Sequence, residues 1–592
     1  MPLPSRSATV QVVLLAASLA TLAACTTSPA PDQRAADERS QEASRATEAK
    51  TAPPRQEAAR RATEPLKPIT AAAPVAPAPA STLPDRVAVA SSGLVQRWAS
   101  PPAYIGPVST AKYTTYAENP WQRSSENPVS TFSASVDTGS YSNVRRFINR
   151  GQLPPQDAVR VEELVNYFGF DAAGPEAGER DPFKVRAQVL ASPWNTERGL
   201  IRIAIKGKDI AKASLPPANL VFLVDVSGSM GPEDRLPLVQ SALKLLTAQL
   251  RPVDRVSLVT YANGTRIALP PTPGDRKSVI NSAIDQLQAG GGTYGEGGLK
   301  LAYAQARDSF IPEGINRVLL ATDGDLNVGE TSQEALKKMI EGERQSGVTL
   351  TALGVGQSNF NEALMKKLAD TGNGSYHYLD SLQEAHKVLV NEMTSTLATI
   401  AQDLKLQVEF NPATVQEYRL IGYELHALKR EDFNNDKVDA GDIGAGHQVT
   451  ALYEFIPAGA KGTVDPLRYG NGGSEGKAST KRTAKEAPRT DKHGELAWIK
   501  LRYKAPGQSA SQLVELPVAR PATMPALAEQ DADTRFAVAV AAWGQWLRGS
   551  SLIGDYGPDQ FVPLARGARG EDRYGHRAEF ARLAELSASL KR

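Results

Sequence analysis

Five oxygen-bearing side chains, in three separate segments of the chain, could together bind a divalent cation. Asp225, Ser227 and Ser229 alternate in the stretch VFLVDVSGSMG. Thr293 follows three glycines, and Asp323 follows the apolar run VLLAT. Two carboxylates neutralise such an ion, while neutral hydroxyls complete the small all-oxygen shell that suits Mg²⁺ or Mn²⁺. No thiolate or clustered imidazole accompanies these residues, which argues against zinc.

The three segments are expected to meet at one edge of a parallel β-sheet. Between residues 217 and 397, apolar runs alternate with amphipathic helical stretches, a pattern typical of a doubly wound α/β domain with about six strands. In such a sheet, ligands bind beyond the carboxyl ends of the strands where the strand order reverses, and the first strand, NLVFLVD, ends at Asp225. The dipeptide Asn263-Gly264 predicts a hairpin that adds one antiparallel strand.

The order and spacing of these motifs resemble the metal-ion-dependent adhesion site of the von Willebrand factor type A domain, called the A domain below. By that resemblance, the residues matching Ser227, Ser229 and Thr293 contact the ion directly. Those matching Asp225 and Asp323 often act through water, and a carboxylate from a partner protein completes the shell. The resemblance therefore implies metal-dependent binding of a protein ligand.

Two other motifs are interpreted as structural. The triplet DTG occurs once, whereas an aspartic protease needs two such loops, so we expect its Asp137 or Thr138 to cap a helix. The stretch from residue 432 to residue 442 resembles a calcium loop. Lys437 and Ile443 stand where an EF-hand needs glycine and a bidentate glutamate, which favours a polar hairpin loop.

The N-terminal segment predicts a lipid anchor. The apolar run VVLLAASLATLAA is too short for a permanent transmembrane helix but suits a secretory signal. It ends in LAAC, which resembles a bacterial lipobox, and Cys25 is the only cysteine of the chain. The resemblance implies a mature N-terminus at Cys25 with lipid on its sulfur, and the following Thr26 favours the outer membrane. An ordinary signal peptide with an incidental cysteine is the alternative.

The regions on both sides of the A domain resemble a bacterial envelope lipoprotein family with a central A domain, a characteristic N-terminal module and a C-terminal module of unknown function. The resemblance rests on FSASVDTGSYSNVRRFIN before the domain and GELAWIKLRYKAPG after it. FKVRAQVLAS and GLIRIAIKG precede the domain and alternate like strands, as do DLKLQVEFNP and VTALYEFIP after it. We expect these strands to pair across the A domain, which would then be inserted in a β-sandwich-like body with additional helices.

The chain is therefore expected to have five parts, in which a segment rich in Ala and Pro forms a disordered tether. These are a signal peptide (1–24), the tether (25–100), an N-terminal α+β module (101–216), the A domain (217–397), and a C-terminal β-rich module (398–592) with terminal helices and a mobile insert near 467–493.

The composition of the chain argues against one class of function, nucleic-acid binding. A net charge of +2 over 592 residues gives no electrostatic reason to expect a nucleic-acid partner. We expect a lipid-anchored envelope protein, not an enzyme, that binds an acidic side chain of a protein partner through Mg²⁺ or Mn²⁺. A scaffold that the ion merely stabilises is one alternative. A metal-assisted hydrolase is another, although no general base is identifiable beside the ligand carboxylates.

Overall fold

The computed structural model describes residues 111–465 and 494–591, apart from residues 136, 177, 325, 327–332 and 358–359. The predicted signal peptide, Cys25, the tether and the insert near 467–493 lie outside the described residues. Within the described part, no helix is long and apolar enough to cross a membrane.

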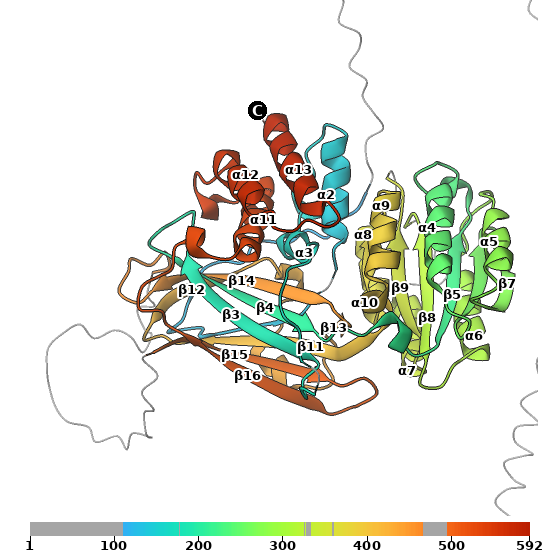
Figure 1. Cartoon of the computed structure of the whole chain (residues 1–592), viewed down its shortest axis with the longest axis horizontal. Helices are drawn as coiled ribbons and strands as arrows, with labels where there is room; N and C mark the ends of the chain where they lie inside the picture. The colour runs from blue at the N-terminus through green and yellow to red at the C-terminus, as the bar shows by residue number, and fades with distance from the viewer. Residues whose placement is uncertain are drawn as a thin grey trace, which may run out of the picture. The chain divides into compact units, whose positions relative to one another are not determined.

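The A domain is built on a six-stranded sheet with the order β10-β9-β8-β5-β6-β7, in which β7 alone is antiparallel to its neighbour (Figure 1). This confirms the predicted doubly wound sheet, and β7 is the strand that the Asn263-Gly264 hairpin adds. The strands are β5 (Ala218–Asp225), β6 (Arg255–Tyr261), β7 (Thr265–Pro273), β8 (Ile315–Thr322), β9 (Thr349–Gly354) and β10 (Tyr376–Tyr378).

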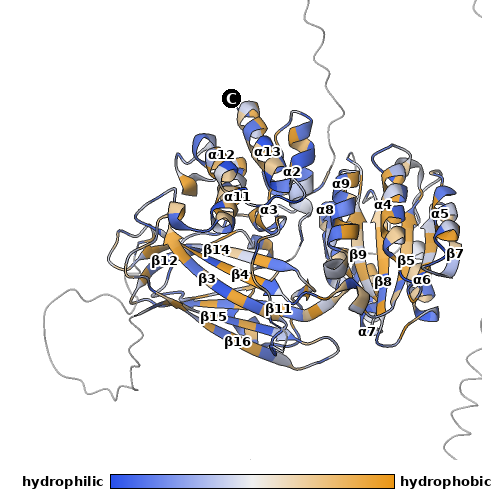
Figure 2. Ribbon diagram, in the orientation of Figure 1, coloured by the Kyte–Doolittle hydropathy of each residue, from blue (hydrophilic) through white to orange (hydrophobic). Residues whose placement is uncertain are grey.

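Helices cover both faces of this sheet, and β5 shows why. Its side chains alternate between two hydrophobic clusters, with Phe222 and Val224 in one and Val221 and Leu223 in the other. Because both faces are buried, the central strands are almost continuously hydrophobic (Figure 2). The helices are α4 (Leu236–Gln249), α5 (Lys277–Asp285), α6 (Gly295–Asp308), α7 (Gln333–Gln345), α8 (Glu362–Thr371), α9 (Leu382–His386) and α10 (Met393–Leu397).

The rest of the described chain forms a body around two antiparallel sheets. One has the order β1-β12-β14-β4-β3, and the other has β13-β11-β15-β16 with β2 paired to β11. β4 precedes the A domain and pairs with β14, which follows it, so the predicted pairing across the domain is confirmed. The strands are β1 (Gln122–Arg123), β2 (Val129–Ser133), β3 (Phe183–Ala191), β4 (Gly199–Gly207), β11 (Thr399–Phe410), β12 (Val415–Ile421), β13 (Gly441–Gly444), β14 (Gln448–Pro457), β15 (Glu495–Lys504) and β16 (Ser511–Ala519).

A layer of helices packs on the sheet that contains β4 and β14 (Figure 1). Its core includes the fully buried Trp543, whose ring meets Phe580 edge-on with centroids 5.1 Å apart. The terminal helices expected in the C-terminal module are present as α11 and α13, with one further helix, α12, between them. The helices are α2 (Gly139–Asn149), α3 (Val161–Asn166), α11 (Ala532–Arg548), α12 (Pro558–Gly567) and α13 (His576–Leu590).

The predicted capping of the helix after DTG is wrong. Thr138 occupies the N-cap position of α2, but its side chain makes no capping hydrogen bond. The Asp137 carboxylate accepts instead from the backbone N–H of Tyr376 on β10, at 3.1 Å. The Ser140 N–H in the first turn of α2 donates to Glu163 on α3, at 2.8 Å. A carboxylate from another helix therefore satisfies the helix start, and Asp137 connects the body to the A domain.

Buried ion pairs strengthen this connection. Arg160 contacts Glu362 at the start of α8, and its Nε lies 2.5 Å from Oε1 of Glu163. Lys366 on α8 lies 2.8 Å from Glu163 and 3.0 Å from Asp137. These side chains are at most 10% exposed, so removing one partner would leave a buried charge without its counterion.

Candidate metal centre

Asp225 ends β5 as a fully buried carboxylate. Its Oδ1 accepts from the backbone N–H of Ser227 at 2.9 Å, and its Oδ2 accepts from the hydroxyl of Thr322 at 2.8 Å. Burial raises the pKa of Asp225, and these neutral donors offset only part of that effect. Among the residues that the structure describes, no cationic side chain pairs with this carboxylate.

Ser227 and Ser229 bring two hydroxyls to the same point. Their Oγ atoms are 3.0 Å apart, because a short 3₁₀ turn at Gly228–Met230 directs both side chains to one side. Ser227 is buried, whereas Ser229 is partly exposed. A hydroxyl pair with one exposed member can bind an ion at the surface of the domain.

Thr293 lies on a loop that packs against the serine-containing turn. The N–H of Gly228 donates to the carbonyl of Gly291 at 2.9 Å, and the N–H of Gly290 donates to the carbonyl of Val226 at 2.8 Å. A Cβ on Gly228 would lie 3.3 Å from the Gly291 oxygen, and Gly291 has φ +84°, so glycine suits both positions. These hydrogen bonds fasten the loop that carries Thr293, which is partly exposed, to the serine-containing turn.

Asp323 follows β8 and is almost fully buried. Its Oδ2 accepts from Nη1 of Arg235 at 2.5 Å. The same Nη1 lies 2.5 Å from the carbonyl oxygen of Ser229, so this guanidinium joins the two predicted ligand segments. Gly356 makes room for it, because a Cβ there would lie 2.6 Å from Nε of Arg235.

The structure therefore places the predicted residues on three segments at the carboxyl edge of the sheet. The hydrogen bonds link Asp225 to Ser227, Ser227 to Ser229, and Ser229 through Arg235 to Asp323. Sequence reasoning missed Arg235 and Thr322. An arginine at the start of a helix gives no sequence signal that its side chain will contact the carboxylate of Asp323. Thr322 is the last residue of an apolar strand, so the sequence predicts a strand residue there rather than a hydrogen-bond donor to Asp225.

The geometry fits a small, octahedrally coordinated divalent ion. Adjacent ligands of such an ion, each about 2.1 Å from it, are separated by about 3.0 Å, which matches the two serine oxygens at 3.0 Å. The charge of the site fits a divalent ion as well. The buried Asp225 carboxylate is bonded only to neutral donors, so a bound cation would compensate its charge. Ser227, Ser229 and Thr293 would hold the ion, with Asp225 and Asp323 supplying negative charge.

The predicted site is distinct from a carboxylate or imidazole cluster. Within the described ranges, no group of three or more His, Cys, Asp or Glu side chains is arranged to hold a metal ion. The calcium-like stretch illustrates this: Asp439 pairs with Arg344 at 2.9 Å, whereas Asp442 accepts from the N–H of Asp403 at 3.2 Å. Asp439 is therefore neutralised by an arginine, in agreement with the interpretation as a polar loop.

The fold and the order of the motifs define the class of protein. A family model described as von Willebrand factor type A domain matches residues 219–391, which is the region of the doubly wound sheet. Domains of this class mediate protein–protein interactions, often through a divalent metal ion. Models described as von Willebrand factor and as Uncharacterized protein YfbK, C-terminal, match residues 107–202 and 395–590.

A relative that matches most of the chain places it in one family within this class. It is 50% identical to Uncharacterized protein YfbK of Escherichia coli (strain K12) over 489 residues, which are 82% of each chain. The chain therefore belongs to the YfbK family.

More distant similarities cover smaller parts or are weak. Uncharacterized protein sll0103 of Synechocystis sp. is 27% identical over 208 residues, which are 34% of this chain and 48% of that protein. The solved von Willebrand factor type A structure from Catenulispora acidiphila has a TM-score of 0.37 and 15% identity, covering 69% of this chain and 91% of that one.

Proposed function

We propose that the A domain binds a protein partner through Mg²⁺, or Mn²⁺, held at Ser227, Ser229 and Thr293 with Asp225 and Asp323. The observation that carries this proposal is the uncompensated buried carboxylate of Asp225 beside two serine hydroxyls 3.0 Å apart. An ion at this position would neutralise the carboxylate from one side. Its remaining coordination site would accept a carboxylate from the partner.

The surroundings of the site suit a protein ligand. Gly290, Gly291 and Gly292 are exposed, and the adjacent Tyr294 side chain is 43% exposed. An exposed loop with an aromatic side chain is a favourable contact surface for another protein, because aromatic residues contribute large buried area at interfaces. We propose further that Cys25 carries lipid and anchors the protein in the cell envelope, at the outer membrane.

Metal binding is tested by isothermal titration of Mg²⁺ into soluble protein that starts after Cys25, with Asp225→Ala as the comparison. We expect heat of binding from the wild type and none from the variant. Equal heats from the two proteins would contradict the proposed site. Metabolic labelling with palmitate, compared between the full chain and Cys25→Ser, tests the anchor, and labelling that persists in the variant would contradict it.

A structural scaffold is the second candidate, favoured by the buried ion pairs that fasten the A domain to the body. A pull-down from envelope extract, with and without a chelator, separates the two functions. Metal-dependent adhesion predicts partners that are lost on chelation and with Asp225→Ala. Partners that remain bound under both conditions would favour the scaffold.

A further inference from the structure

We propose that Arg235 is a resident cation of the metal site, which lowers the affinity for a free divalent ion and leaves the bound ion with a net positive charge for an anionic partner group. This inference rests on the proposed function. Arg235 lies outside the predicted ligand set, and the two carboxylates of the site differ in their surroundings. Asp323 has Arg235 at 2.5 Å, whereas Asp225 has only neutral hydrogen-bond donors.

The position of Arg235 is built into the fold. Arg235 is 7% exposed, and its guanidinium contacts both Asp323 and the backbone of Ser229. The glycine at 356, with φ +76°, leaves the space that this side chain fills. A long cationic side chain buried against two metal-binding segments cannot leave the site without repacking, so its charge is a fixed property of the site.

The charge balance gives the consequence. Asp225, Asp323 and Arg235 together carry a formal charge of −1, so a divalent ion bound among them leaves a complex with a charge of +1. Without Arg235, the same complex would be neutral. Like charges held close together in a partly desolvated site repel one another strongly. Arg235 therefore weakens binding of the ion alone, and a carboxylate from a partner restores neutrality.

The ligand segments have supports that do not depend on Arg235. Thr322, the residue before Asp323, accepts from the backbone N–H of Val355 at 3.0 Å, and its hydroxyl accepts from the N–H of Gly324 at 3.1 Å. The turn at Ser227 is held by the Asp225 carboxylate. Replacing the arginine is therefore expected to change the charge of the site more than its geometry.

The test is the affinity for Mg²⁺ alone, measured by isothermal titration of the soluble chain. Arg235→Gln, which removes the charge and retains an amide donor, should bind Mg²⁺ about tenfold more tightly than the wild type. Arg235→Lys, which retains the charge, should stay within about threefold of the wild type. Unchanged or weaker binding by the glutamine variant would overturn the inference.

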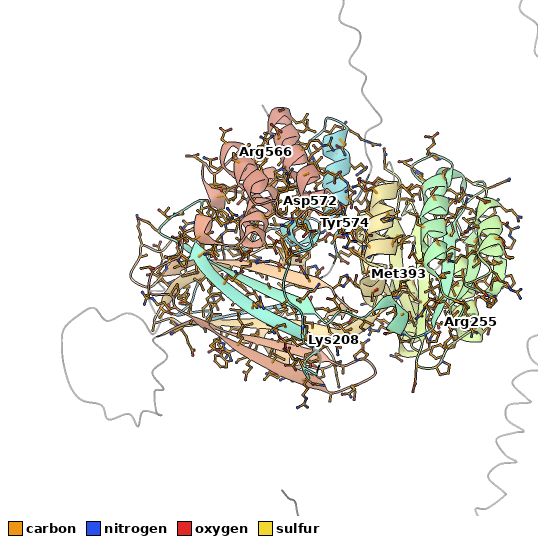
Figure 3. The ribbon with its side chains drawn as sticks, viewed as in Figure 1. Lys208, Arg255, Met393, Arg566, Asp572 and Tyr574 are labelled. Carbon is orange, nitrogen blue, oxygen red and sulfur yellow. The ribbon has the colours of Figure 1, made fainter. Side chains whose placement is uncertain are left out.

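Arg255→Gln is the matched control, because it makes the same charge change at the other end of the sheet. Arg255 is the first residue of β6, and its side chain is labelled in Figure 3. In the pairing of β5 with β6, Arg255 lies opposite Asn219 at the start of β5, whereas Tyr261 lies opposite Asp225 at its end. Six residues of strand separate the two ends by about 20 Å, which is beyond the screening length of about 8 Å at physiological salt. Its Mg²⁺ affinity should equal that of the wild type.

Gly356→Ala and Asp225→Ala complete the test. If Arg235→Gln does not fold, Gly356→Ala tests the same inference, because its methyl group would displace the guanidinium. This variant should also bind Mg²⁺ more tightly than the wild type. An unchanged affinity would count against the inference. If neither the wild type nor Asp225→Ala binds Mg²⁺, the proposed metal site fails as well. If the wild type binds Mg²⁺ and Arg235→Gln binds it with the same affinity, the role of Arg235 is rejected while the metal site itself stands.

Discussion

Asp225 and Asp323 are both buried carboxylates at the ends of neighbouring strands, yet their surroundings differ in charge. Arg235 compensates Asp323, whereas Thr322 and the backbone of Ser227 offer Asp225 only dipoles. Burial of an uncompensated carboxylate is unfavourable unless a cation is bound or the group is protonated. Asp225 is therefore the residue at which the presence of a metal ion should have its largest effect on stability.

Asp225→Asn should separate two effects of this carboxylate on stability, namely destabilisation by its burial and stabilisation by a bound metal ion. In a chelator, we expect the variant to be at least as stable as the wild type, because a carboxyl whose pKa is raised by burial destabilises the fold at neutral pH. At Mg²⁺ concentrations about 100 times the dissociation constant, the wild type should gain about 2.7 kcal/mol and the variant nothing. Thermal unfolding with and without Mg²⁺ measures both effects.

Asp275→Asn is the control for this experiment, because Asp275 is exposed on the same domain. It should keep the full stabilisation by Mg²⁺. A variant at Asp225 that is stabilised as much as the wild type would show that the ion binds elsewhere.

At the scale of elements, helix α8 depends on residues that lie far from it in the sequence. Glu362 in its first turn contacts Arg160, and Lys366 contacts Glu163 on α3. The start of α8 also lies against the loop that carries Asp323, since a Cβ on Gly324 would lie 2.7 Å from the backbone nitrogen of Asn361. The ion pairs therefore fix an element that borders the metal site.

Arg160→Met should destabilise the protein by about 3–5 kcal/mol, because it leaves the buried carboxylate of Glu362 without its cation and leaves Glu163 with Lys366 alone. Arg150→Met is the control, because Arg150 is exposed at the end of the neighbouring helix α2, and its loss should cost less than about 0.5 kcal/mol. Denaturant unfolding of both variants measures the difference. Equal stabilities of the two variants would show that the attraction between Arg160 and its carboxylates only offsets the free energy lost in desolvating them.

The same cluster predicts how stability depends on pH. Burial alone would raise the pKa of Glu163, but Arg160 and Lys366 outweigh it and hold that pKa well below its usual range. A lowered carboxyl pKa contributes stability that is complete above the unfolded value of about 4.3 and is lost as the pH falls towards the folded value. The wild type should therefore exceed Glu163→Gln in melting temperature by a constant amount between pH 5.5 and 8.

Below about pH 4 this difference should shrink, because the wild-type carboxylate then becomes protonated in the unfolded chain. Lys366 sets the upper pH limit of the stability that this cluster contributes. Burial would lower the pKa of Lys366, but Glu163 and Asp137 raise it above its usual value. Its contribution is present below the unfolded value of about 10.4 and is lost at higher pH. A difference that is constant down to pH 2 would contradict this account of Glu163.

At the scale of the whole molecule, the A domain is an insertion in the body. Two hydrophobic clusters consist entirely of body residues, and the strands of the body pair with one another rather than with the A domain. The chain leaves the body after β4 and returns at β11, and these two points are adjacent. A Cβ on Gly207 would lie 2.9 Å from the side chain of Ile400.

The body should therefore fold without the A domain. A variant in which a short Gly-Ser linker replaces residues 209–397 should be soluble and unfold cooperatively, with a lower melting temperature because Arg145 and Arg160 lose partners in the domain. Near-ultraviolet circular dichroism, to which the buried Trp543 contributes, reports packing of the helical layer. Removing α13 from the same variant is the control that should weaken this signal, and an aggregated linker variant would contradict the insertion.

Periodicity predicted most of the regular structure because each element buries one recognisable face. One of the amphipathic stretches expected between residues 217 and 397 forms α4, and its apolar residues, spaced three and four apart, are all buried. They are Leu236, Val239, Leu243, Leu246 and Leu250. α12 was not predicted because Pro563 lies inside it and interrupts the helical pattern. The cap at α2 was predicted wrongly because the partner of its first turn, Glu163, comes from another helix.

The sequence by itself determined the doubly wound domain, its insertion between pairing strands, and the candidate ligands, because alternating polarity and strand-end motifs are local properties of the chain. Only the tertiary structure decided which charges those ligands meet. Arg235 lies on Asp323 and no described cation lies on Asp225, and that difference depends on how a helix start and a distant glycine pack together. Charge compensation inside a protein is a long-range property, since it is set by three-dimensional distance and burial rather than by spacing along the chain.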